Sequence, residues 1–188
     1  SNLAAVYFSR SFFGKAEENF LKALAIDQAR FGAEHPFVAA DLSNLAAIYL
    51  NQAKYDRAES SYRQALRIDE RSLGKDHPQV ARDFDDLGRV REARGDTQGA
   101  EDFFRRALQL REKALPADHP DMAYSFNNLG ALMLQRLKKS TPAANDPPLG
   151  ISELIFRQSQ WLQVESLFQK ALTIAELYRC RWQVELFF

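Results

Sequence analysis

The chain lacks several features that would place it in a class at once. Its 188 residues include a single cysteine, Cys180, so no intramolecular disulfide can form and a reducing compartment, the cytoplasm, is expected. No apolar run approaches the ~18 residues that suggest a membrane span. The 25 basic and 25 acidic residues balance, so the sequence offers no basic face for nucleic acid. We therefore expect neither a membrane nor a nucleic acid as partner.

Motifs for catalysis and cofactor binding are also missing. No Gly-rich phosphate loop, Ser-His-Asp arrangement or paired-carboxylate pocket stands out. The histidines at 35, 77 and 119 are spread along the chain, whereas zinc needs ligands that converge within ~2.1 Å of one point. Each histidine is better explained as a connector residue that bonds nearby backbone. The sequence predicts no enzyme activity, no cofactor and no metal site.

What the chain does have is an internal repeat. The dipeptide His-Pro begins at 35, 77 and 119, so it recurs with a constant period of 42. The same step aligns alanines at 16, 58 and 100, further alanines at 23, 65 and 107, and an Asn-Leu or Asp-Leu pair at 2, 44, 86 and 128. A fixed period in the range of about 20–50 residues indicates stacked supersecondary units that bury their apolar faces against one another.

Each repeat is predicted to form two antiparallel helices. In repeat two these run over Phe37–Gln52 and Lys54–Gly74, and the apolar residues of the first recur at i, i+3, i+4 and i+7. Pro36 suits the first turn of a helix, and Gly74 suits a left-handed stop. No alternating β pattern is present, so the chain is predicted to be all-α.

Small and large residues alternate in a way that resembles the tetratricopeptide repeat. Helix A reads Leu45-Ala46-x-x-Tyr49, and helix B reads Ala58-x-x-x-Tyr62-x-x-Ala65. With Gly-x-x-His-Pro at two connectors and a period of 42 instead of 34, the repeats look like the kinesin-light-chain type. The third connector departs from it, because Pro116 takes the glycine position. The resemblance implies a right-handed α-solenoid of tetratricopeptide-like helix pairs.

The fourth repeat is interrupted. Residues 1–137 hold repeats one to three and helix A of repeat four, but prolines at 142, 147 and 148 rule out a regular helix where helix B should follow. The helix B pattern returns at 161–177, where Val164 aligns with Ala58, although the repeat register places that position at 142. We interpret 138–160 as a Pro-rich insertion whose simplest role is a surface loop.

Residues 171–188 carry a second resemblance, to the C-terminal signature of insertion-sequence transposases of the DDE type, and 178–188 are its helical tail. Tyr178, Arg181 and Glu185 fit that signature, in which the glutamate helps to hold two metals. The two aspartates of a separate β-rich core are missing, so the resemblance implies an inert tail left by a gene fusion. The alternative is a helical cap that matches by chance. Because this tail is apolar, we expect self-association through the C-terminal end.

The tetratricopeptide resemblance also implies a function, the binding of a protein or peptide segment in the concave groove lined by the A helices. Helical projection and the Asn/Asp ladder define the candidate residues. They are Ser43, Asn44, Asn51, Arg82, Asp85, Asp86, Arg89, Tyr124, Asn127, Asn128 and Gln135.

Two alternatives are open for these candidates. Arg82 and Arg89 project from one face and suit an acidic segment, but Asp85–Arg89 and Arg82–Asp86 are also ordinary i, i+4 pairs. By resemblance the ladder asparagines bond a peptide backbone, or they bond between neighbouring A helices. We expect an adaptor or scaffold. The rival functions are the inert fusion remnant and a self-assembling structural array.

Overall fold

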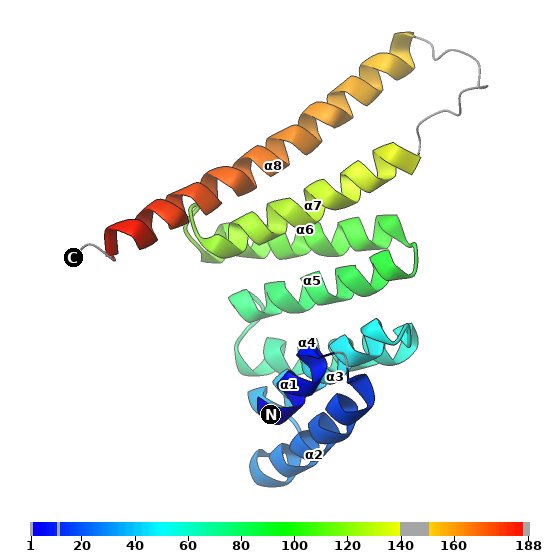
Figure 1. The fold of residues 1–188 in the computed structure, drawn as a ribbon, viewed down its shortest axis with the longest axis vertical. Helices are drawn as coiled ribbons and strands as arrows, with labels where there is room; N and C mark the ends of the chain where they lie inside the picture. The colour runs from blue at the N-terminus through cyan, green and yellow to red at the C-terminus, as the bar shows by residue number, and fades with distance from the viewer. Residues whose placement is uncertain (1, 11, 140–150, 186–188) are drawn as a thin grey trace. The chain divides into compact units, whose positions relative to one another are not determined.

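The chain folds into helices connected by short turns. The computed structural model describes residues 2–10, 12–139 and 151–185, and these contain eight α-helices and no strand (Figure 1). In chain order the helices are α1 (Asn2–Ser9), α2 (Phe13–Phe31), α3 (Pro36–Asn51), α4 (Tyr55–Ser72), α5 (Pro78–Ala93), α6 (Thr97–Ala114), α7 (Pro120–Lys139) and α8 (Ile151–Glu185). Contacts divide the chain into a first unit, Ser1–Leu110, and a second unit, Arg111–Phe188.

Helices α3, α5 and α7, the A helices of repeats two to four, each begin at the proline of a His-Pro dipeptide. The Nδ1 atoms of His35, His77 and His119 accept hydrogen bonds from the backbone N–H two residues later, at 3.2, 3.1 and 3.2 Å. The histidine therefore caps the helix as an Asn or Ser side chain does, and the following proline needs no partner because it has no N–H. The predicted bond between connector histidine and backbone is confirmed.

The turns require unusual backbone conformations at two positions of the repeat. Gly74, the predicted left-handed stop, has a φ of +93°, which glycine adopts without steric cost. The turn inside the hairpin of repeat two places Ala53 at φ +57°, and the equivalent turn of repeat three places Gly95 at φ +82°. Alanine is strained there, so the turn of repeat two carries a cost that repeat three avoids.

The core of the first unit repeats with the sequence. Ala58, Tyr62 and Ala65 of α4 are at most 1% exposed. Tyr62 packs in one cluster with Ala46 of its own hairpin and with Leu87 of α5. Because one B-helix aromatic fills the space between two successive A helices, each hairpin buries its apolar face only when its neighbour is present.

Glycine replaces alanine where this aromatic comes closest. At Gly88, which takes the place of Ala46 in the next repeat, an added Cβ would lie 2.6 Å from the Phe104 ring. The corresponding Gly130 in the second unit would place a Cβ 3.2 Å from Phe168. The small residues of helix A are therefore set by the close approach of a B-helix aromatic, as the alternation of small and large residues predicted.

Helix α8 differs from the prediction in length. It begins at Ile151, so residues 151–160 belong to the same helix as 161–177, and only the part of the predicted 138–160 insertion before Ile151 lies outside this helix. Helix α8 packs on α7 with Val164 and Ile174 buried, whereas Ile155 and Phe156 are 63% and 55% exposed. No proline interrupts the chain after 148, so the helix extends past the part that packs.

The prolines at 142, 147 and 148 lie outside the described residues. So does the end of the transposase-like segment: α8 runs to Glu185, but the side chains of 178–188 are not among those described.

Candidate functional site

Helices α3 and α5 of the first unit contact each other and expose one stripe each. On α3 the stripe holds Ala40, Asn44, Ala47 and Asn51, and on α5 it holds the residues one repeat later, Arg82, Asp86, Arg89 and Ala93. All eight are exposed or half-buried, whereas most of the other surface of both helices is buried by neighbouring helices. We call these eight residues the A-helix stripe.

The polar side chains of the A-helix stripe are partly engaged with one another. Arg89 Nη2 lies 2.6 Å from Asp86 Oδ1, an i, i+3 ion pair whose arginine side chain stays 43% exposed. Asn51 Nδ2 donates to the Ala47 carbonyl of its own helix at 2.8 Å. Arg82 and Asn44 are exposed. The stripe therefore offers cationic and amide groups on a surface that is already ordered.

Two of the predicted residues lie deeper than helical projection placed them. Asp85 is 1% exposed, so its carboxylate does not lie on the exposed face, and Ser43 is half-buried. Helical projection assumed that only the apolar side of each A helix is buried. In a stack, an A helix is covered by its own B helix and by a neighbouring hairpin on each flank, so the buried arc is wider.

The remaining candidates lie on α7 in the second unit. Tyr124 is 42% exposed, and the Arg111 guanidinium carbon lies 5.8 Å from the centre of its ring. Asn127 and Gln135 are exposed, and Asn128 is half-buried. Tyr124, Asn127 and Gln135 are therefore the exposed candidates on α7.

An ion-pair cluster joins α4 to the end of α5. Glu59 of α4 lies 2.9 Å from Arg63, 2.7 Å from Arg91 and 3.6 Å from Arg94. Arg91 also contacts Asp96, at 3.2 Å. Burial raises the pKa of Glu59, but the hydrogen bond from Arg63 and the three arginine charges outweigh it and lower the pKa. Because Arg91 and Arg94 come from the next hairpin, the cluster fixes α5 relative to α4.

A ladder of polar pairs, each with at least one buried member, could not be seen in the apolar pattern of the sequence. Each pair joins helix B of one repeat to helix A of the next. The pairs are Asp27–Asp41 and Asp69–Asp83 in the first unit and Arg111–Ser125 in the second. The signal was available, because a polar residue recurs once per repeat beside the apolar stripe, at 41, 83 and 125.

In each of the two aspartate pairs, at least one carboxyl group has a raised pKa. Burial raises the pKa of Asp83 to about 8, and the charges of Asp69 and Asp86 act in the same direction. Burial likewise raises the pKa of Asp41 to about 6, with a further contribution from the charge of Asp27. Two carboxyl groups in one buried site cannot both ionise at low cost, so each pair is best satisfied when it shares a proton.

No site for metal chemistry is formed by the part of the chain that the structure describes. Within it, histidines, cysteines, aspartates and glutamates do not gather in any group of three or more that could hold an ion. Among the described helices, none combines the length and apolar character needed to cross a bilayer.

Comparison with known proteins addresses the fold. Solved structures with the same arrangement include BtubC (BKLC) from P. vanneervenii, at 24% identity and a TM-score of 0.71 over 94% of this chain. This chain spans 62% of the length of BtubC. A kinesin light chain with nearly identical TPR-like repeats from Podosopora anserina is 21% identical, with a TM-score of 0.63 over 93% of this chain and 92% of that one. These TM-scores show a common fold, the predicted all-α solenoid of tetratricopeptide-like helix pairs.

The sequence itself identifies the family. No curated protein matches the chain. The profile described as tetratricopeptide repeat matches residues 1–71 and 39–113, which together make up more than half of the chain. The regular repeat register, the His-Pro helix starts and the packing of small residues against aromatics give the physical basis of that match. The chain belongs to the tetratricopeptide repeat family.

Proposed function

We propose that the A-helix stripe of the first unit binds a segment of a protein partner, so that the chain acts as an adaptor. Tetratricopeptide repeats are in general scaffolds for protein interaction and not catalysts. One observation supports the A-helix stripe as the binding face. On two adjacent helices, Asn44, Arg82 and Arg89 are exposed and Asp86 is half-buried, while most of the other surface of those helices is buried.

The partner segment is expected to be acidic. Arg82 is exposed, and Arg89 keeps 43% of its side chain exposed while it is paired with Asp86. A guanidinium can bond a carboxylate through two parallel N–H groups, and the Asn44 amide can both donate to and accept from a peptide backbone. The stripe lies on helices held by the core and by the Glu59 cluster, so binding orders little of the protein and the entropic cost of association is small.

The proposal is tested by partner recovery from an extract of the native host. Wild-type chain is compared with Arg82→Glu/Arg89→Glu, which reverses the charge of the A-helix stripe. The matched control, Arg67→Glu/Arg71→Glu, makes the same charge change on two exposed arginines of α4. Circular dichroism confirms that each variant is folded.

We expect the stripe variant to lose its partner by about tenfold or more and the control to retain it. Equal recovery by all three proteins would remove the stripe from the binding site. A loss that is the same in both variants would show that net charge, and not the stripe, governs recovery.

Self-association through the C-terminal end is a separate proposal. It follows from the apolar residues of 178–188, whose side chains lie outside those described. Sedimentation at several protein concentrations tests it, because an assembling chain gains mass with concentration and a non-assembling adaptor does not.

A further inference from the structure

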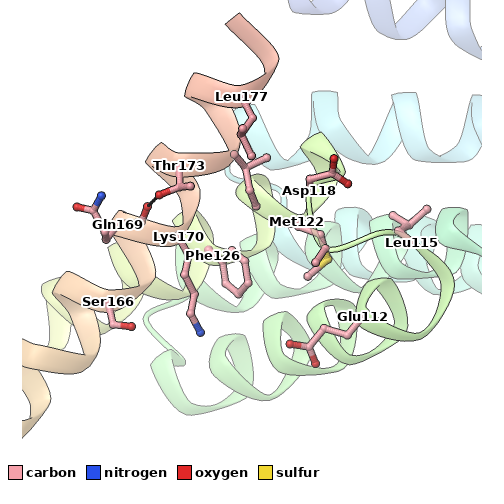
Figure 2. A pocket seen from close by; sticks show the side chains of 12 residues that line it. Glu112, Leu115, Asp118, Met122, Phe126, Ser166, Gln169, Lys170, Thr173 and Leu177 are labelled. Carbon is pink, nitrogen blue, oxygen red and sulfur yellow. Dashed lines mark hydrogen bonds between the residues drawn. The ribbon is translucent and has the colours of Figure 1, made fainter. Parts of the chain in front are cut away.

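The second unit contains an apolar cleft that the proposed function does not use. It has a volume of about 690 Å³ and lies between α8 on one side and the end of α6 with the α6–α7 connector on the other. Its floor is formed by Met122 and Phe126 of α7, and its walls include Leu115 of the connector and Leu177 of α8 (Figure 2). Leu177 is 53% exposed. This volume lies in the range of about 300–1,000 Å³ in which proteins hold compact apolar groups.

The charges around the cleft are arranged on two sides. Glu112 of α6 and Asp118 of the connector line one side, and both residues are exposed. Lys170 of α8 lines the other side, where its Nζ atom lies 5.3 Å from the centre of the Phe126 ring. The cleft therefore has an apolar floor with two carboxylates on one side, which complements a ligand that carries an apolar group next to a positive charge.

In one connector of the first unit, an equivalent carboxylate binds an arginine. Glu34 takes the position of Asp118 two repeats earlier, and its Oε2 lies 2.8 Å from Arg71 Nη1 of α4. In the alignment of α8 with α4, the position of Arg71 is taken by Leu177. The repeat position that holds an arginine in the first unit therefore holds part of the apolar wall in the second unit.

We propose that this cleft docks a protein segment that presents a large apolar side chain and an arginine or lysine within about one helical turn of each other. The apolar side chain enters between Leu115 and Leu177 above Met122 and Phe126. The basic side chain reaches Asp118 and Glu112, as Arg71 reaches Glu34. This surface lies in the second unit and is distinct from the A-helix stripe, so it provides a second attachment point on the same chain.

The test uses a phage-displayed library of short random peptides, selected on the full chain. Binders are then measured by fluorescence anisotropy against Leu177→Ser and against Glu112→Gln/Asp118→Asn. The matched control is Leu172→Ser, because Leu172 is 51% exposed on the same helix but does not line the cleft. Substituting an exposed leucine leaves the core of the unit unchanged, which circular dichroism checks.

We expect enriched peptides to pair an apolar residue with arginine or lysine. Their affinity should fall by about tenfold or more in Leu177→Ser and in the double variant, and should be unchanged in Leu172→Ser. The affinity should also be unchanged in Arg82→Glu/Arg89→Glu, which separates this site from the A-helix stripe.

The proposal is overturned if selection yields no binder that depends on Leu177. It is also overturned if the binders lack a basic residue, or if Leu172→Ser weakens them as much as Leu177→Ser. Binding that is lost only in the stripe variant would assign the peptides to the A-helix stripe instead.

Discussion

The buried pair Asp69–Asp83 predicts that the fold becomes less stable as the pH rises. The pKa of Asp83 is about 8 in the folded chain, against an ordinary value of 3.8. The folded state therefore keeps this proton more tightly than the unfolded state does. The stability that Asp83 contributes is fully present below about pH 4. Above that, the free energy of unfolding falls by about 1.4 kcal/mol for each pH unit until about pH 8.

The substitution Asp83→Asn removes this titration. Asparagine has nearly the same shape as a protonated aspartate and can still donate a hydrogen bond to Asp69. Since the wild-type residue costs at most about 4 kcal/mol at about pH 7, we expect the variant to be more stable there by about 2–4 kcal/mol. At about pH 4, close to the ordinary pKa of 3.8, the penalty is below about 1 kcal/mol, so the two proteins should be nearly equal.

Urea unfolding followed by circular dichroism between about pH 4 and pH 9 measures the effect. Helix content is the better signal, because both tryptophans, Trp161 and Trp182, belong to the second unit. The control Asp76→Asn changes the same charge at an exposed position. The reasoning is refuted if Asp83→Asn lowers the urea midpoint at about pH 8, or if its gain over wild type does not grow with pH.

Three further substitutions test the packing and the turns by the same unfolding measurement. Gly88→Ala should destabilise by about 1–3 kcal/mol despite the better helix propensity of alanine, since its Cβ would meet Phe104 at 2.6 Å; a gain in stability would disprove the close approach. His77→Ala should cost about 1 kcal/mol, because a helix cap is lost, and an unchanged midpoint would show that the cap is unimportant. Ala53→Gly should stabilise by up to about 1 kcal/mol by relieving a φ of +57°, and a loss would contradict the strain.

The helix pairs could be predicted because their determinants are local and periodic. The helices predicted at Phe37–Gln52 and Lys54–Gly74 are found at Pro36–Asn51 and Tyr55–Ser72. Proline, glycine and the spacing of apolar residues act within a few residues of the chain, so one sequence reveals them. The constant period then identifies which residues take equivalent places in the stack.

The features that escaped prediction depend on what surrounds a residue. Asp85 looks exposed on an isolated helix, and only the neighbouring hairpins bury it. The pairing of Asp69 with Asp83 joins two helices of different repeats, so neither residue is notable alone. The continuity of α8 from Ile151 was not predicted, because its first turns expose Ile155 and Phe156 and so have no repeat partner that marks where the helix begins.

Hydrogen–deuterium exchange of the chain alone and with its recovered partner tests the central claim most directly. If the A-helix stripe is the binding face, added protection appears in α3 and α5, and Arg82→Glu/Arg89→Glu abolishes it. Protection confined to α2 and α4, with α3 and α5 unchanged, would contradict the claim.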